Sequence, residues 1–401
     1  LYSNGTATLN AAVQQNIAAG DGGGIWNDGT LTINGGSYNS NQANNGAGLY
    51  NASNGSVTLT NAGVATNTAS ANGGGVYNLG TVSISSAGVG PNNGANNGGG
   101  IWNDGVLTIT SAGVTTNTAS TNGGGIYNAN SGSVTLNAAG VSDNQAPNGS
   151  GGGIYNQNGT AVIFNFSRIN GNVINNTGFL PAQGGGIWNG ATLVITSSSV
   201  NSNTAAATNS SGFASAAGGG IYNQSATALH ITGTQVNSNT VTAVGSSGAN
   251  AQGGGVHNEF NSAIYITNSS VIANATVAAG GIGSGQARGG GVSNGGTVAI
   301  ARSTINNNSA AGDFAFGGGV FSAAPAPSAL TIEDSQVNAN VASGGLAQGG
   351  GVHNQFGDAE MRRGTIAGNV VSATNNAQGC LLYTSDAADD LLCVDLGGRR
   401  I

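Results

Sequence analysis

The sequence predicts an all-β fold, a right-handed single-stranded parallel β-helix (a β-solenoid), on three observations. A motif of glycines, an aliphatic residue, an aromatic residue and an asparagine recurs along the chain, for example at residues 22–27, 98–103 and 184–189. Between its copies, aliphatic residues alternate with Thr and Ser, which is typical of half-buried strands. No apolar pattern with the helical period of 3.6 residues accompanies this repeat. Short strands that recur at a fixed spacing indicate a coil in which every repeat stacks on the next.

The repeat at residues 98–122 shows how one turn is built. An extended segment at 101–103 is followed by the turn dipeptide Asp104-Gly105 and by the alternating strand 106–110. A second turn leads to a third extended piece at 114–117. We therefore expect three short strands per turn and about 13 turns, which form a rod of roughly 60 Å at 4.8 Å per turn. Right-handed coiling is expected by analogy with parallel crossover connections.

Aliphatic residues at equivalent positions predict the columns of a narrow core. One column runs from Ile25 to Val352 beside the glycines, a pair of columns includes Leu107 and Ile109, and another includes Val114. The glycines are expected to permit tight turns and positive φ.

Asparagine recurs with equal regularity. It follows the aromatic residue of each motif, as Asn103 does, and it also ends a Val-x-x-Asn pattern. Because side-chain amides can bond to one another along a stack, we expect a structural ladder. The Val-x-x-Asn ladder includes Asn67, Asn92, Asn117, Asn144, Asn172, Asn203 and Asn239.

Composition excludes some partners and predicts where the repeat domain lies. Charged residues are 5% of the chain, lysine is absent and the net charge is -7, so no nucleic-acid partner is expected. No apolar run is long enough for a transmembrane helix. Residues 1–3 match 49–51 without the preceding glycines, so we expect a β-helix domain at 1–379 that is truncated at both ends.

Residues 380–401 differ from the repeats in every respect. They hold both cysteines, four of the 14 acidic residues and no asparagine. The segment resembles an in-frame translation of a transposase-type sequencing adapter, and it replaces the glycines expected after Gly379. We interpret it as a non-native tail that does not continue the coil. The alternative is a genuine cap with a bond between Cys380 and Cys393.

A pattern of [Val/Ile]-x-x-Asn followed by Gly-Gly-[Gly/Ala]-[Ile/Val] covers nearly all of residues 1–379. This pattern resembles the repeats of polymorphic outer-membrane proteins and autotransporter passengers. The resemblance implies a bacterial secreted or cell-surface (outer-membrane) protein with a structural or adhesin-like role. The chain departs from the family in its triple glycines, its Val or Ile in place of Phe, and its lack of cysteine in the repeats.

The alternative class is a polysaccharide-degrading β-helix enzyme, a lyase or glycosidase. Such enzymes need clustered carboxylates. The charged residues gather only around Glu333-Asp334 and Asp358–Glu360 with nearby arginines, which we interpret as a solvated patch. His257 and His353 stand three turns apart, roughly 14 Å, too far to share a metal. We therefore expect no catalytic residues, no metal and no cofactor.

Two features predict binding. The motif aromatics follow an inward residue, so alternation directs them outward as an aromatic file of Trp26, Tyr50, Tyr77, Trp102, Tyr127, Tyr155, Trp188 and Tyr222. Such a file either stacks on itself or contacts glycans or host cell-surface proteins. Long return loops at 204–217, 240–252 and 275–288 are expected to cluster along one edge. Outward Thr and Ser rows leave an ice-binding solenoid as a further alternative.

Overall fold

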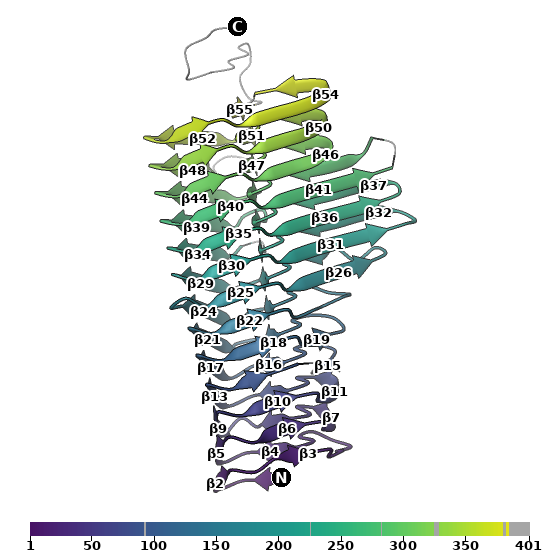
Figure 1. The fold of residues 1–401 in the computed structure, drawn as a ribbon, viewed down its shortest axis with the longest axis vertical. Coiled ribbons are helices and arrows are strands. Elements are labelled where there is room, and N and C mark those ends of the chain that lie inside the picture. Colours follow the sequence, from purple (N-terminus) through teal and green to yellow (C-terminus); the bar gives the residue numbers. More distant parts are fainter. Residues whose placement is uncertain (92–93, 225, 282, 325–328, 380–381, 385–401) are drawn as a thin grey trace. The chain divides into compact units, whose positions relative to one another are not determined.

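The computed structural model describes residues 1–91, 94–224, 226–281, 283–324, 329–379 and 382–384. It has two compact units: unit 1 comprises Leu1–Ile174 and Gly185–Ser199, and unit 2 comprises Asn175–Gly184 and Val200–Ile401. Within each unit the chain coils as a right-handed parallel β-helix, which confirms the predicted fold class (Figure 1). The described residues include no helix that is long and apolar enough to cross a membrane.

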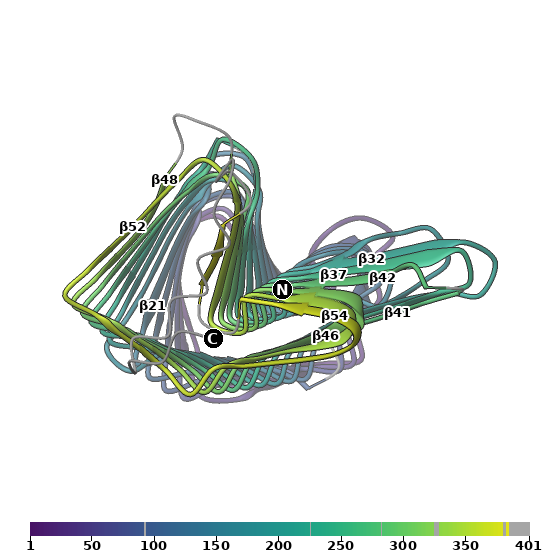
Figure 2. The ribbon, with the colours of Figure 1, turned by 90° about the horizontal axis from the view of Figure 1, so that it is seen from above.

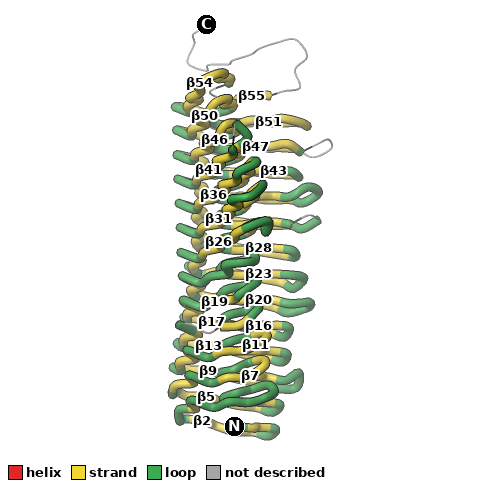
Figure 3. Tube along the Cα trace, turned by 90° about the vertical axis from the view of Figure 1, so that its right-hand side faces the viewer, coloured by secondary structure: helices red, strands yellow, loops and turns green. Residues whose placement is uncertain are grey.

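Each turn of unit 1 supplies one strand to each of three parallel sheets. Figure 3 shows the turns of unit 1 stacked on one another. Sheet A of unit 1 comprises β1 (Tyr2–Ser3), β4 (Ile25–Asn27), β8 (Leu49–Asn51), β12 (Val76–Asn78), β16 (Ile101–Asn103), β20 (Ile126–Asn128), β23 (Ile154–Asn156) and β28 (Ile187–Asn189). Sheet B comprises β2 (Thr6–Leu9), β5 (Thr30–Asn34), β9 (Ser56–Thr60), β13 (Thr81–Ser85), β17 (Val106–Thr110), β21 (Ser133–Asn137), β24 (Thr160–Phe164) and β29 (Thr192–Thr196). Sheet C comprises β3 (Val13–Gln14), β6 (Ser37–Asn39), β10 (Gly63–Ala65), β14 (Gly88–Val89), β18 (Gly113–Thr115), β22 (Gly140–Ser142) and β25 (Arg168–Asn170).

Unit 2 has the same three sheets. Sheet A of unit 2 comprises β33 (Ile221–Asn223), β38 (Val256–Asn258), β43 (Val292–Asn294), β47 (Val320–Ala323), β51 (Val352–Phe356) and β55 (Leu382–Thr384). Sheet B comprises β34 (Ala228–Thr232), β39 (Ala263–Thr267), β44 (Thr297–Ala301), β48 (Ala329–Glu333) and β52 (Asp358–Arg362). Sheet C comprises β35 (Gln235–Asn237), β40 (Ser270–Ile272), β45 (Thr304–Asn306), β49 (Gln336–Asn338) and β53 (Thr365–Ala367). Two strands, β26 (Val173–Thr177) and β30 (Ser199–Asn201), carry residues of both units. The eight sheet B strands of unit 1 and the five of unit 2 give the 13 turns that the sequence predicts.

A fourth sheet, sheet D, is formed by the segments that precede the glycines, and the sequence did not predict it. In unit 1 it consists of the short strands β7 (Gln42–Asn45), β11 (Thr68–Asn72), β15 (Gly94–Ala95) and β19 (Thr118–Ala119). In unit 2 it projects as an arm on the side away from sheet B strands β48 and β52 (Figure 2). The outgoing strands of the arm are β31 (Thr204–Asn209), β36 (Thr240–Gly245) and β41 (Ala275–Gly280), and the returning strands are β27 (Ala182–Gln183), β32 (Phe213–Ala217), β37 (Gly248–Gln252) and β42 (Gly285–Arg288). In later turns one long strand spans the arm: β46 (Ser309–Phe316), β50 (Val341–Gln348) or β54 (Val370–Gln378).

The predicted core columns are correct. In register, Val82 pairs with Leu107 and Ile84 with Ile109 in sheet B, and Val89 pairs with Val114 in sheet C. The side chains of Leu107, Ile109 and Val114 are fully buried. Each turn therefore completes its apolar core with the turns on either side.

The three glycines of a motif have different roles. Gly98 adopts a φ of +61°, which favours glycine. A Cβ on Gly99 would lie 2.5 Å from the backbone of Thr118, and one on Gly100 would lie 2.7 Å from the carbonyl oxygen of Gly125. The first glycine thus makes the turn, and the next two permit the close approach of the neighbouring turn.

The asparagine ladder is present in both units. In unit 1, the Asn144 side-chain amide donates to Asn172 Oδ1 and to the Val114 carbonyl, at 3.0 and 2.9 Å. Its own Oδ1 accepts from the backbone and side chain of Asn117. Asn41 donates to Asn67 in the same way, and in unit 2 Asn203 donates to Asn239. Of the predicted members, Asn92 lies outside the described residues.

The asparagine after each aromatic residue forms a second ladder. Asn103 Nδ2 donates to Asn128 Oδ1 at 2.8 Å and to the Gly105 carbonyl at 3.1 Å. Both asparagines are fully buried. This side chain therefore joins two turns and also closes the corner between sheets A and B.

Two further corners place residues other than glycine at positive φ. Ser111, between sheets B and C, has a φ of 49°, and Thr116, just before a ladder asparagine, has a φ of 58°. This conformation costs free energy for a β-branched residue such as threonine. The backbone amide of Thr116 donates to the Ser142 carbonyl of the next turn, which compensates part of that cost.

The expectation that the coil stops at Gly379 is wrong for three residues. The backbone of β55 pairs with β51 in register, with Leu382 opposite Val352 and Thr384 opposite Asn354. Cys380 and Cys393 lie outside the described residues, so the proposed cap and its disulfide stay untested. The adapter origin of the tail also stays a prediction.

Removal of one buried ladder side chain should destabilise unit 1 strongly. Asn144→Ala removes the bonds that its side chain makes with the Asn117 amide, the Val114 carbonyl and Asn172 Oδ1. We expect a loss of roughly 3 kcal/mol in the free energy of unfolding, measured by urea denaturation. Asn158→Ala, at an exposed turn, is the matched control and should change it by less than about 0.5 kcal/mol. Equal effects of the two substitutions would contradict a structural ladder.

Candidate functional site

The aromatic file of unit 1 is a continuous stack of rings. Tyr2 precedes the predicted members, and successive rings from Tyr2 to Trp188 have centroids 4.2 to 6.5 Å apart. Their planes lie within 13° of parallel. Register causes this arrangement, because Tyr77 pairs with Trp102 and Trp102 with Tyr127 in adjacent strands. The ring faces are therefore covered by one another, and their edges are turned outward.

Most members of the file are half-buried, but two are buried. Trp26 to Tyr155 keep part of their surface in solvent, whereas Trp188 is 7% exposed and Tyr222, in unit 2, is 4% exposed. The expectation that all eight rings face solvent is thus wrong for Trp188 and Tyr222. Gly190 packs closely against the Trp188 ring, since a Cβ there would lie 2.7 Å from it. Burial raises the pKa of Tyr77 and of Tyr155 to about 12, so both phenols stay neutral.

In unit 2 the same column changes its chemistry. Tyr222 is followed in register by His257, Ser293, Phe321 and His353. The Tyr222 and His257 rings stack at 5.3 Å, and Phe321 lies 5.4 Å from His353. Ser293 supplies no ring. His257 and Phe321 are therefore two strand spacings apart, about 9.6 Å, and the position between them carries Ser293 instead of a ring.

A cavity of about 220 Å³ opens at this interrupted position. It is lined from three strands of sheet A, from the corner residues that follow them, and from the returning strands of the arm. The lining residues are Gln252, His257, Asn258, Glu259, Phe260, Arg288, Ser293, Asn294, Gly295, Phe321 and Ala323. We call this the Ser293 cavity.

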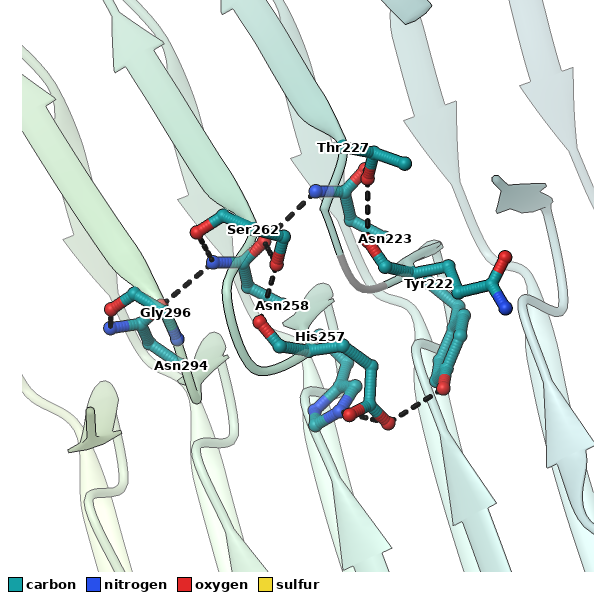
Figure 4. Close-up of polar contacts among 10 residues, drawn as sticks. Tyr222, Asn223, Thr227, His257, Asn258, Ser262, Asn294 and Gly296 are labelled. Atoms are coloured by element: carbon teal, nitrogen blue, oxygen red, sulfur yellow. Dashed lines mark hydrogen bonds and ion pairs between the residues drawn. The ribbon is translucent and has the colours of Figure 1, made fainter. Parts of the chain in front are cut away.

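Glu259 is held at one side of the Ser293 cavity. Its Oε1 accepts a hydrogen bond of 2.6 Å from the Tyr222 hydroxyl and lies 3.5 Å from His257 Nε2 (Figure 4). The hydrogen bond from His257 is the main cause that lowers the pKa of Glu259 to about 2, with a further contribution from Tyr222. The carboxylate is therefore ionised and accepts hydrogen bonds at every ordinary pH.

Arg288 lies at the other side of the cavity. Its guanidinium stacks on the Phe321 ring at 5.5 Å from the centroid, and one terminal nitrogen donates to Gln286. Burial lowers the pKa of Arg288. Within the described part of the chain, no carboxylate pairs with it, and its Nε is buried without a hydrogen-bond partner. Nδ1 of His257, a residue that is 5% exposed, is likewise buried without a hydrogen-bond partner among the described residues.

The sequence singled out several of these residues for other reasons. His257 stands in the sequence where other repeats have Trp or Tyr, and Arg288 is the last residue of a long return loop, whereas the sequence assigns no role to Glu259. The signal that could have found the site is Ser293, the first small residue in a column of rings.

The charged cluster predicted near the later turns is a solvated patch, as expected. Arg363 pairs with Glu333 and Asp334, and Arg362 pairs with Glu360. The Arg363 guanidinium lowers the pKa of Asp334. Among the described residues, no three His, Cys, Asp or Glu side chains gather in a way that could hold a metal ion.

The long segments before the glycines do cluster on one edge of unit 2, but they are strands rather than irregular loops. Thr204–Asn209 pairs along its length with Thr240–Gly245, and Ala249–Gln252 pairs with Gly285–Arg288. This pairing brings Gln252 and Arg288 beside the column of His257 and Ser293.

His353 should make the stability of unit 2 depend on pH. It is 2% exposed, and burial lowers its pKa to about 4, against a bond to the Gln348 backbone that raises it and the Arg288 charge that lowers it. The folded-state pKa of His353 lies below the ordinary value of 6.5. The stability that neutral, buried His353 contributes is therefore fully present above pH 6.5 and is lost as pH falls toward 4. The difference corresponds to roughly 3 kcal/mol.

The test compares the free energy of unfolding of the wild type and His353→Phe between pH 7.5 and 4.5. Phenylalanine preserves the ring contacts with Phe316 and Phe321 but cannot titrate, so we expect a shallower loss in the variant. His230→Phe, at an exposed position, controls for the removal of an imidazole. The same loss in wild type and His353→Phe would show that another group is responsible.

Comparison with protein-family models, curated proteins and solved structures finds no match for this chain. The assignment of the parallel β-helix fold therefore depends on the sequence repeat and on the structure itself. The register of its sheets and its asparagine ladders identify the chain as a parallel β-solenoid.

Proposed function

We propose that the chain is a non-catalytic β-helix protein of the bacterial cell surface or extracellular space, with a structural and adhesin-like role. The repeat pattern that resembles polymorphic outer-membrane proteins and autotransporter passengers supports this placement. The single observation that carries the adhesive role is the stack of ring edges along sheet A of unit 1. Glycans or proteins of another cell surface are its proposed partners.

The stack has the physical properties of an adhesive surface. Stacking fixes each ring, so little side-chain entropy is lost when a partner binds. The outward edges of Tyr and Trp combine apolar carbon with a hydroxyl or an indole N–H, which suits contact with sugars and with polar protein surfaces. Repetition from Trp26 to Tyr155 offers the same contact many times, and multivalency raises weak affinities.

A specific observation favours a second candidate, a polysaccharide-degrading enzyme. Glu259, His257 and Arg288 line one cavity beside the arm of unit 2. An ionised carboxylate near a histidine can transfer protons. Against catalysis, the cavity holds a single carboxylate, whereas glycoside hydrolysis ordinarily uses two.

The adhesive role is tested by glycan-array and cell-binding measurements on the purified chain. We expect Trp26→Ala and Trp102→Ala each to weaken binding at least tenfold. Each substitution removes an exposed ring edge and the stacking contact that fixes the neighbouring rings. Trp102→Tyr keeps an aromatic ring at this position and should retain most of the binding. Phe166→Ala removes a ring that is 79% exposed outside the file and should have no effect.

Circular dichroism of the variants distinguishes lost contacts from lost folding. Unchanged binding by folded Trp26→Ala and Trp102→Ala would leave the file purely structural. Shortening of pectin or alginate chains by the wild type would replace the adhesive role by the enzymatic one. Thermal hysteresis in dilute solution would support the ice-binding alternative instead, through outward hydroxyls such as Thr58 and Thr108.

A further inference from the structure

We propose that the Ser293 cavity binds one six-membered sugar ring that carries a carboxylate, a hexuronic acid unit of an acidic glycan. This inference rests on the proposed function in one respect, namely that the partner is a glycan. It assigns the recognition of that glycan to unit 2 and to residues outside the predicted aromatic file.

The first argument is the missing ring. Along sheet A of unit 2 the side chains at this column are Tyr222, His257, Ser293 and Phe321. Where rings follow one another they lie about one strand spacing apart, as Tyr222 and His257 do at 5.3 Å. At Ser293 the backbone register continues but the ring is absent. A side chain smaller than a ring thus leaves room at this position, and the Ser293 cavity opens beside His257 and Phe321, which line it and are 5% and 3% exposed.

The second argument is the unpaired cation. Arg288 is largely buried, stacks on Phe321 and lacks a carboxylate partner among the described residues. A buried charge without a counter-ion is costly, and a guanidinium pairs best with a planar carboxylate. A ligand carboxylate at this side of the cavity would supply the missing partner.

The third argument is the opposite polarity of the other side. Glu259 is an ionised acceptor that Tyr222 and His257 hold in place. Hydrogen-bond donors such as sugar hydroxyls suit it, whereas a simple anion would be repelled. Nδ1 of buried His257 also lacks a partner, and it lies in a side chain that lines the cavity. A uronic acid offers both chemistries on one ring: a carboxylate for Arg288 and hydroxyls for Glu259 and His257.

The size of the cavity limits the ligand to about one ring. Its volume of about 220 Å³ is below the range of roughly 300–1,000 Å³ that accommodates drug-sized molecules. Glu259 and Phe260 keep part of their surface in solvent, and Phe260 is 49% exposed. A polymer can therefore place one unit in the cavity and continue outside it.

The test is calorimetric titration of the full chain with tri-galacturonate and with its methyl ester, in which each carboxylate charge is replaced by a neutral methyl ester. We expect binding of the acid and at least tenfold weaker binding of the ester. Arg288→Gln, which removes the cation, and Ser293→Phe, which refills the ring position, should each weaken binding of the acid at least tenfold. Arg302→Gln removes an arginine that bonds to Asn268 outside the cavity and should bind like the wild type.

Equal binding of acid and ester, or unchanged binding by folded Arg288→Gln and Ser293→Phe, would overturn the proposal. Thermal melting of both variants establishes that they are folded, and phenylalanine already occupies the same column at Phe321. The outcome is separable from the test of the proposed function. Loss of array binding in Trp26→Ala with no uronate binding would overturn only this inference, whereas uronate binding that depends on Ser293 would support it even if the aromatic file proved inert.

Discussion

In-register hydrogen bonding between equivalent residues of successive turns is the constraint on which the rest of this structure depends. Parallel strands satisfy their backbone groups only with neighbours in the turns before and after, so each turn must repeat the path of the last. The buried asparagines reinforce this at the corners, where backbone groups would otherwise lack partners. The Asn144 side chain alone joins its turn to both neighbours through four hydrogen bonds. The glycines before each sheet A strand follow from the same constraint, because the turns approach too closely there for a Cβ.

Register also explains where the aromatic stack and the Ser293 cavity lie. Register places a side chain directly beside the equivalent side chains of the adjacent turns. Aromatic residues at one repeat position therefore stack on one another. A change in one member alters the surroundings of both neighbours. Thus the small side chain of Ser293 leaves a cavity that His257 and Phe321 line, and Arg288, which also lines it, stacks on the Phe321 ring. The cavity is therefore a local departure from the repeat rather than a separate structural element.

Much of the fold could be predicted from the sequence because its signals are periodic. Aliphatic residues such as Leu107 and Ile109 alternate with Thr, and the glycine triplets mark each turn, so strands, columns and ladders follow from spacing alone. The arm could not be predicted, since segments such as 204–217 consist mainly of Ala, Thr, Ser and Asn without clear alternation. Positive φ at Ser111 and Thr116 was also missed, because it is imposed by the neighbouring turns and not by local preference. The Ser293 cavity depends on Glu259 and Arg288, which lie 29 residues apart and meet only once the register is known.

The replacement of a ring by Ser293 has a consequence for how such a chain can evolve. The backbone of that turn keeps the same pairing as its neighbours, with Val292 opposite Val256 and Val320. A single codon change in a column can therefore open or close a cavity while the strand pairing is kept. Each turn offers an independent place for such a change, and duplication of turns multiplies the number of places. A coil of this kind can thus diversify its ligands one position at a time, much as variable loops do on a constant framework.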